Sequence, residues 1–334
     1  MWLSPRPSGA RPRSAAALCT TSAVAAALVM RAGALRADDF FATRNQNPLL
    51  RGFYQPLPAD ARTDSGATWS AALLVSNTLN VEHHAQESLT VDGESTALNL
   101  AYENAISRRW RYRLSVPIIH DSGGVLDSAI DTWHGLFGFS RGARPFYPKR
   151  QIDYSYSSSN GARIGLDRAQ TGIGDIAADV GWYAVDEERR TLSLWGGIKA
   201  PSGSPANLTG DGAWDGALWG HAAARWPQWQ LAAEAGVSQP FGDEIFAGKA
   251  HRSVAMMRLA ATRALGTVWS VRAQLDAQTG RVAGSELRFL GPSLQLTVGA
   301  VRRLAGRWRM QIGIVEDAAV NTAPDITLFL GIHD

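Results

Sequence analysis

The stretch RRWRYRLSVPII, residues 108–119, alternates strictly between apolar and polar side chains. On an extended strand the apolar positions all point to one side, and they are Trp110, Tyr112, Leu114, Val116 and Ile118. The opposite side carries two arginines, Arg111 and Arg113. This pattern predicts a β-strand with one apolar face and one charged face.

Similar alternation recurs along the chain in twelve stretches, each about as long as a tilted strand needs to be to cross a bilayer. We expect strands at 67–77, 95–104, 110–119, 173–184, 191–200, 213–225, 228–238, 252–263, 267–278, 292–303, 307–318 and 324–333. Such strands satisfy their backbone hydrogen bonds in a membrane only when the sheet closes on itself.

The connections between these stretches alternate in length. Short ones, AISRR, VDEERR, WP, ALG and AGR, alternate with longer ones around 78–94, 120–172, 201–212, 239–251 and 279–291. Outer-membrane barrels have tight periplasmic turns and longer extracellular loops. The sequence therefore predicts an all-β fold, an up-and-down transmembrane β-barrel of about 12 antiparallel strands over residues 67–334.

Tryptophans recur close after the short connections. The indoles concerned are Trp69, Trp110, Trp229, Trp269 and Trp308. In an up-and-down barrel they would share one height, where an indole keeps its ring in the apolar band and its N–H among the headgroups. We interpret them as an aromatic girdle.

The inward faces of the same strands are polar or small, and many carry charge. The candidate lumen-lining residues are Asn99, Glu103, Arg111, Arg113, Asp175, Asp179, Lys199, Glu234, Arg258, Arg272, Asp276, Arg309 and Gln311. In a sandwich core each unpaired charge would cost several kcal/mol, whereas a water-filled or hydrogen-bonded lumen accommodates it. Arg113→Leu is therefore expected to be milder than an arginine at lipid-facing Leu114.

The N-terminus resembles an export signal, with early arginines, an apolar run over 15–30 and small residues at Ala32 and Ala34. We expect a signal peptide over 1–34, with a cut after 37 as the alternative, and a periplasmic N-terminal segment over 35–66. Its removal would take away the single cysteine, Cys19, and four arginines, so the formal charge would fall from +3 to −1. The excess of basic residues in the whole sequence then gives no reason to expect binding to nucleic acid.

The connection over 120–172 is far longer than ordinary loops, which indicates a function or structure of its own. Its apolar residues from Val125 to Phe137 have helical spacing and predict a short amphipathic helix followed by a basic turn. The loop is expected to be extracellular and either to constrict the lumen or to rest on the outer leaflet. The candidate constriction residues are Trp133, His134, Phe137, Arg141 and Arg144.

Three segments carry a resemblance to a known family: NPLLRGFYQPLPADAR, HDSGGVLDSAIDTWHGLFGFSRGAR and GIKAPSGSPANLTGDGAWD. They are similar to a family of uncharacterised Gram-negative outer-membrane proteins classed as a domain of unknown function, number 3187. The resemblance covers nearly the whole chain after the export signal. It implies a β-barrel in the outer membrane and no particular activity.

One pair of residues raises an enzymatic alternative. His120 and Ser122 are two apart at the end of the third strand, an arrangement similar to that of outer-membrane phospholipase, with hydroxyl attack and imidazole as base. Here Gly123 follows in chain order where that family has asparagine, and no third partner is evident. A polar start of the loop accounts for the pair more simply.

Three functions remain open: a narrow passive channel or small-molecule uptake protein gated by 120–172, a lipid hydrolase, and a structural barrel with a closed lumen. A continuous lumen would favour the first, a third polar partner for His120 and Ser122 the second, and a lumen filled by paired charges the third. The expected partners are outer-membrane lipid, small solutes and the outer-membrane insertion machinery, with no nucleic acid. No motif suits zinc, a nucleotide or haem, so we expect no cofactor and no metal.

Overall fold

The computed structural model describes residues 38–59, 66–128, 132, 146–242, 244–246, 249–250, 253–319 and 322–334. The predicted export signal, and the candidate constriction residues Trp133, His134, Phe137, Arg141 and Arg144, lie outside these ranges. No helix in the described part of the chain is long and apolar enough to cross a membrane.

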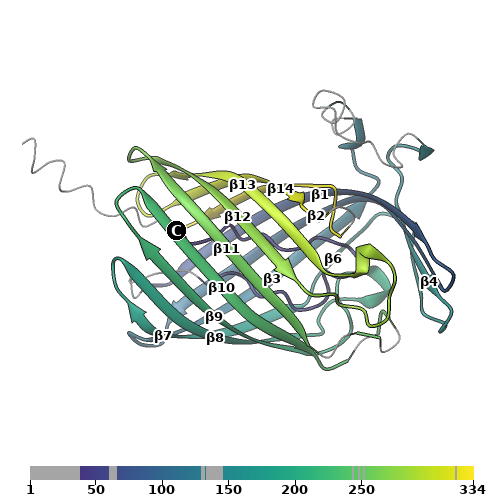
Figure 1. Cartoon of the computed structure of the whole chain (residues 1–334), viewed down its shortest axis with the longest axis horizontal. Coiled ribbons are helices and arrows are strands. Elements are labelled where there is room, and N and C mark those ends of the chain that lie inside the picture. The colour runs from purple at the N-terminus through teal and green to yellow at the C-terminus, as the bar shows by residue number, and fades with distance from the viewer. Residues whose placement is uncertain are drawn as a thin grey trace, which may run out of the picture.

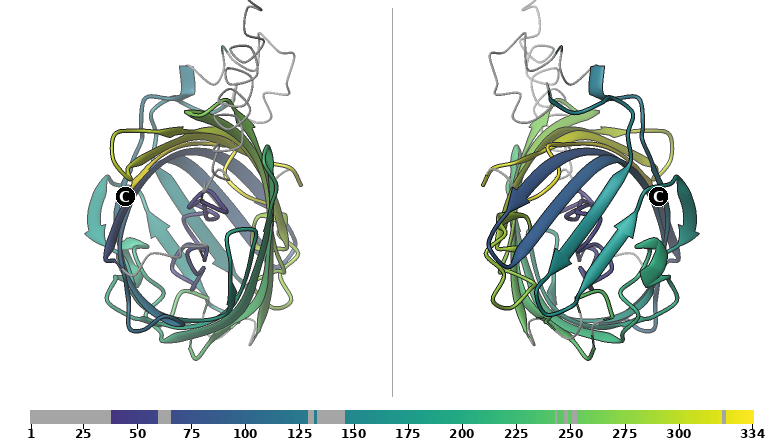
Figure 2. Two further views of the ribbon diagram at one scale, coloured as in Figure 1. Left: turned by 90° about the vertical axis from the view of Figure 1, so that its left-hand side faces the viewer. Right: turned by 90° about the vertical axis from the view of Figure 1, so that its right-hand side faces the viewer.

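Twelve antiparallel strands close into a barrel, which confirms the predicted fold class (Figures 1 and 2). They are β1 (Thr68–His83), β2 (Glu87–Ala105), β3 (Trp110–Ser122), β7 (Ile176–Asp186), β8 (Arg190–Ala200), β9 (Asp215–Arg225), β10 (Trp229–Pro240), β11 (Val254–Leu265), β12 (Trp269–Gln278), β13 (Ser293–Arg303), β14 (Arg309–Asp317) and β15 (Ile326–His333). Pairing of β1 with β15 closes the ring, so neither strand has an open edge.

The two ends of the barrel differ, as the connection lengths predict. At one end, here called the turn end, short turns join β2 to β3, β7 to β8, β9 to β10, β11 to β12 and β13 to β14. The other connections lie at the opposite end, here called the loop end. The five candidate girdle indoles are 38% to 60% exposed near the turn end, and their contact with a membrane interface stays a prediction.

The connection expected over 78–94 is in fact a hairpin. β1 continues to His83 and β2 begins at Glu87, and the two strands are paired throughout this extension. Here β2 also pairs with β4 (Asp153–Ser158), which in turn pairs with β5 (Arg163–Leu166). These strands project beyond the others in Figure 1. The period-two pattern did not predict this extension. One of the two strands that pair with β2 there, β4, lies about 65 residues further along the chain.

The remaining short elements lie at the loop end. β6 (Gln170–Ile173) pairs with the end of β3, and two single-turn 3₁₀ helices are η2 (Pro205–Asn207) and η3 (Arg288–Leu290). The described part of 120–172 therefore extends the sheet. The lumen constriction by residues outside the described ranges stays a prediction.

Residues 38–59 run inside the barrel, and we call them the plug (Figure 2). The chain enters at the turn end, where Asp38 contacts β14, and reaches a turn at 48–52 beside the loop end. It then returns, so that Ala59 contacts β10. The expectation that 35–66 is a periplasmic segment is thus wrong for 38–59. A polar segment without periodicity fits either place, and only its partners on distant strands decide between them.

An apolar cluster anchors the plug turn at the loop end. The buried members include plug residues Leu49, Leu50 and Phe53 together with Leu89, Val91, Tyr154, Tyr156, Ala162, Leu166, Leu208, Ile245, Phe246, Val282, Leu287, Phe289 and Leu290. Gly52 lets the plug pass close to the β8–β9 connection, because a Cβ there would lie 2.8 Å from the Asp211 backbone nitrogen. The loop end is therefore covered from inside by apolar packing.

The face assignment of β3 can be tested at Leu114, which is 47% exposed on the outer surface. We expect Leu114→Arg to lower the free energy of unfolding by about 2–4 kcal/mol if the residue lies near the bilayer midplane, because a charge enters hydrocarbon. Urea unfolding in lipid vesicles measures the loss. Leu114→Ala is the control for lost packing, and an equal loss in both variants would contradict a lipid-facing Leu114.

Candidate functional site

The turn end of the plug is bound through Asp38. Its carboxylate accepts hydrogen bonds from Gln311 at 2.7 Å and from Arg309 at 3.0 Å, and it also contacts His333. The Asp38 carbonyl accepts from Arg272. Inward-facing groups of β12, β14 and β15 thus converge on one plug residue.

Asp39 makes a second ionic contact on the opposite wall. The Asp39 carboxylate accepts from Arg225 at 2.7 Å and also from Gln230, and it lies 3.0 Å from the His221 Nε2 atom. Arg225 and His221 are two of the inward positions of β9, where their side chains share one face. The wall therefore compensates the negative charges of both Asp38 and Asp39.

Two phenylalanines of the plug fill the lumen above this pair. Phe40 packs on three small inward residues, Ala223, Ala232 and Ala260. Phe41 packs on Phe329 and the neighbouring apolar residues of the opposite wall. The small residues on these inward faces leave the space that the two rings occupy.

The returning limb is held by carboxylates and one arginine. Asp179 accepts from Tyr54 and, at 2.8 Å, from Arg113. Arg113 also donates to the plug carbonyls of Leu57 at 2.7 Å and Pro58 at 2.6 Å. Arg113 therefore links the wall to the plug and is not a free lumen charge.

A lysine surrounded by carboxylates holds the plug near the loop end. Lys199 donates to the Gly52 carbonyl at 2.8 Å and to Asp175 at 2.9 Å, and it also contacts Asp211 and Asp215. Asp215 accepts from the plug amide of Tyr54 at 2.6 Å. Burial and the neighbouring Asp215 raise the pKa of Asp211, which lies in the β8–β9 connection, to about 7.

Another plug arginine is paired nearby. The Arg51 guanidinium donates to Asp121 on β3, at 2.8 Å through Nη1, and to Ser95 on β2 at 2.9 Å. Asp121 has no exposed surface. The plug thus presents charge to the wall along most of its length.

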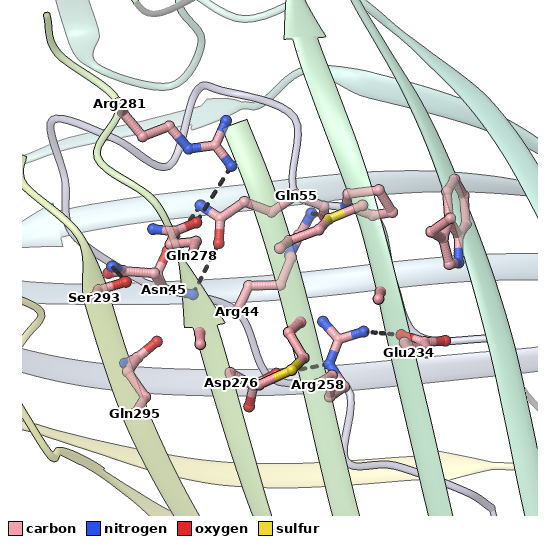
Figure 3. A pocket seen from close by; sticks show the side chains of 16 residues that line it. Arg44, Asn45, Gln55, Glu234, Arg258, Asp276, Gln278, Arg281, Ser293 and Gln295 are labelled. Carbon is pink, nitrogen blue, oxygen red and sulfur yellow. Dashed lines mark hydrogen bonds and ion pairs between the residues drawn. The ribbon is translucent and has the colours of Figure 1, made fainter. Parts of the chain in front are cut away.

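The plug leaves three cavities against the wall. One of about 530 Å³, including space open to solvent, lies between the plug and β10 to β13 (Figure 3). Another of about 480 Å³ lies toward β2, β3, β7 and β8, and a third of about 670 Å³ lies toward β1 to β3, β14 and β15. Arg44 lines the first two cavities.

All thirteen candidate lumen residues lie inside the barrel, and most of them contact the plug. The direct plug contacts are made by Asn99, Arg113, Asp179, Lys199, Glu234, Arg272, Asp276, Arg309 and Gln311. The others are paired within the wall, with Arg111 on Glu103, Asp175 on Lys199 and Arg258 between Glu234 and Asp276.

The structure does not assemble a hydrolytic site at His120 and Ser122. His120 points outward and its Nδ1 lies 2.8 Å from the Thr171 hydroxyl, whereas Ser122 accepts from the Gly124 amide at 3.2 Å. In the described part of the chain neither side chain contacts the other or a carboxylate. Among these residues no group of three or more His, Cys, Asp and Glu side chains is arranged to hold a metal ion either.

Several residues of the site escaped the sequence analysis. They are the plug residues themselves and their partners Asp121, Asp211, Asp215, His221, Arg225 and Arg281. A signal for them was present in the register of the strands. Arg272 lies opposite Thr262 on one side and Gly299 on the other, so an inward cation has no acid beside it in the wall. Such a cation indicates a partner from outside the sheet.

The fold and interior define a class: a narrow twelve-stranded outer-membrane-type β-barrel whose lumen is occupied by its own N-terminal segment. The chain belongs to the family described as Protein of unknown function (DUF3187), whose model matches residues 16–333, and the resemblance noted in the sequence is thus confirmed. No curated protein matches the chain.

Three solved structures are similar to the chain. An outer membrane channel from Pseudomonas putida F1 has 13% identity and a TM-score of 0.54, with 84% of this chain and 99% of that chain covered. The CymD monoaromatic hydrocarbon channel has 11% identity and a TM-score of 0.39, with coverages of 89% and 94%. The KdgM porin has 6% identity and a TM-score of 0.41, with coverages of 79% and 97%. The likeness to the first of these structures shows the fold alone.

The bonds of Arg113 change one expectation from the sequence. Removal of its guanidinium leaves Asp179 without its ionic partner and two plug carbonyls without their donor, so Arg113→Leu is expected to cost about 3–5 kcal/mol of unfolding free energy. Urea unfolding in lipid vesicles measures it. The double variant Arg113→Leu with Asp179→Asn is the control and should recover part of the loss. A mild effect of the single variant would contradict the linking role.

The raised pKa of Asp211 predicts a pH dependence of stability. The stabilisation from protonated Asp211 is fully present below its ordinary pKa of 3.8 and is lost as pH rises through about 7, because the buried cluster then gains a negative charge. Urea unfolding between pH 5 and pH 8 should show this loss in the wild type and a flatter profile in Asp211→Asn. Identical profiles for the two proteins would exclude Asp211 as the titrating group.

Proposed function

We propose that the protein is a small-solute channel of the outer membrane in which the plug, and not the 120–172 loop, is the gate. The observation that carries the proposal is the way the plug is held. Along both limbs ion pairs and hydrogen bonds, which water can replace, join the plug to the wall beside the apolar contacts of Phe40 and Phe41, and cavities flank it on several sides. A barrel of twelve strands is narrower than a general porin, so the passage would suit small solutes.

The orientation follows from the same geometry. Short turns are typical of the periplasmic side and long connections of the outside, which supports a periplasmic turn end. Export by the signal at 1–34 would deliver the chain there. The exposed outer face, with Leu194, Leu231, Leu275 and Leu330 among its apolar residues, would meet lipid.

One observation favours a second candidate, a structural barrel with a closed lumen. Most inward charges are paired with each other or with the plug, as in a permanently filled interior. The two candidate functions differ in whether the plug can move out of the lumen. The geometry of His120 and Ser122 supports no hydrolase, and we propose no enzymatic activity.

Removal of the plug tests the gate. We expect a variant lacking residues 38–59, refolded into planar bilayers, to conduct ions more strongly and for longer than the wild type, because its limbs no longer fill the lumen. Single-channel recording measures this, and the mobility shift between heated and unheated samples on gels verifies folding.

A milder variant avoids the large deletion. Asp38→Asn combined with Asp39→Asn weakens the turn-end anchor and should increase the frequency of opening. Glu187→Gln is the matched control, since Glu187 is exposed at the same end and pairs only with exposed Arg190 in the turn. Electrically silent barrels in both plug variants would overturn the channel proposal and support the closed structural barrel.

A further inference from the structure

The cavity beside β10 to β13 contains a buried arginine whose side-chain partners are all neutral. Arg281 is 1% exposed, and its guanidinium donates to the Ser238 hydroxyl at 3.2 Å, the Tyr54 carbonyl at 3.3 Å and the Gln278 amide oxygen at 3.3 Å. No carboxylate of the described residues lies within ion-pair distance of it. Arg281 therefore lines the cavity without an ion pair to any described residue (Figure 3).

A second arginine of the same cavity also has only neutral hydrogen-bond partners. Arg44 of the plug donates to the Gln55 carbonyl at 3.4 Å and to the Asn99 amide oxygen, and again to no carboxylate within the described ranges. Arg258 in the same cavity is different, because it bonds both Glu234 and Asp276. Among the described residues that line the cavity, three arginines thus face two carboxylates, which leaves one positive charge in excess.

The hydrogen-bond donors of the cavity are also in excess. Three buried donor atoms, Nε of Arg281, Nε2 of Gln278 and Nε1 of Trp219, have no acceptor among the described residues. Gln278 is oriented by its oxygen, which accepts from Arg281, so its NH₂ group is left over. Buried donors without acceptors are rare, and together they indicate a missing acceptor.

Burial lowers the pKa of Arg281 to about 10, and the more distant Asp215 and Asp211 partly offset this effect. Both acids are already bound to Lys199. Arg281 therefore remains charged at neutral pH, and its desolvated charge favours any anion that reaches the cavity.

The rest of the lining includes apolar side chains. Pro56, Trp219 and Met256 are among the lining residues, and the whole cavity measures about 530 Å³ with its solvent-open part. A concave lining that combines apolar side chains with a few convergent polar groups is typical of sites for small organic ligands. Arginine binds a carboxylate through two parallel hydrogen bonds.

We propose that this cavity binds a small organic carboxylate, its anionic group on Arg281 and Arg44 and its apolar body against Trp219 and Met256. The inference rests on the proposed channel function, for which it names the class of solute. Its test does not need an open pore, because binding is measured on the intact, plugged protein.

Benzoate and benzamide are suitable probes because they have similar shape and differ in charge. We expect benzoate to bind the detergent-solubilised wild type by titration calorimetry and to raise its unfolding temperature, whereas benzamide at the same concentration does neither. Arg281→Gln should weaken benzoate binding about tenfold or more, since a charge-assisted hydrogen bond is lost. Arg281→Lys should retain part of the affinity.

Arg288→Gln is the matched control, because Arg288 is exposed in the same connection and the substitution changes the net charge equally. It should bind benzoate like the wild type. Arg44→Gln gives a second test if Arg281→Gln does not fold. Equal binding of benzoate and benzamide, or unchanged benzoate affinity in folded Arg281→Gln or Arg44→Gln, would overturn the carboxylate site. A silent plug deletion with intact benzoate binding would instead refute only the channel.

Discussion

Compensation of buried charge inside the barrel is the constraint on which the rest of the structure depends. The strands need an apolar outer face to lie in lipid, and strict alternation then places every polar position in the lumen. With twelve strands the lumen is too narrow to keep all these groups in bulk water. They must pair with each other or with something placed among them, and the plug supplies carboxylates at Asp38 and Asp39, guanidinium groups at Arg44 and Arg51, and backbone carbonyls in between.

The wall and the plug therefore specify one another. Cross-strand pairs such as Glu234 with Arg258 compensate charge within the sheet. Where the sheet lacks an acid, as beside Arg272, the plug provides a carbonyl. Where the wall carries only alanine, as at Ala223, Ala232 and Ala260, the plug provides Phe40. Polarity and volume thus change together along the lumen, which explains why the inward faces combine large charged residues with very small ones.

The sequence was sufficient to predict the strands of the barrel but not the plug that fills the lumen. Each strand of the barrel was predicted because period-two alternation is a local property, and the faces of Leu114 and Arg113 followed from it. The extension of β1 and β2 depends on β4, and the plug depends on twelve strands at once, so neither has a local signature. Arg113 illustrates the consequence. Its inward direction was predicted, but its bonds to Leu57 and Pro58 were not, and these bonds change the expected effect of its removal.

The two ends of the plug are held by different forces, and this difference bears on how a channel of this design would open. At the loop end Leu49, Leu50 and Phe53 are buried, and each buried side chain of this kind contributes roughly 1.5–3 kcal/mol. At the turn end Asp38 and Asp39 are held by ion pairs, whose net contribution is small only where water can solvate both partners, and Phe40 and Phe41 are buried beside them. A cavity of about 670 Å³, including space open to solvent, lies there beside Asp38 and His333. In the proposed channel the ionic contacts at the turn end are therefore the ones that water can replace, while the apolar turn keeps the plug attached to the barrel.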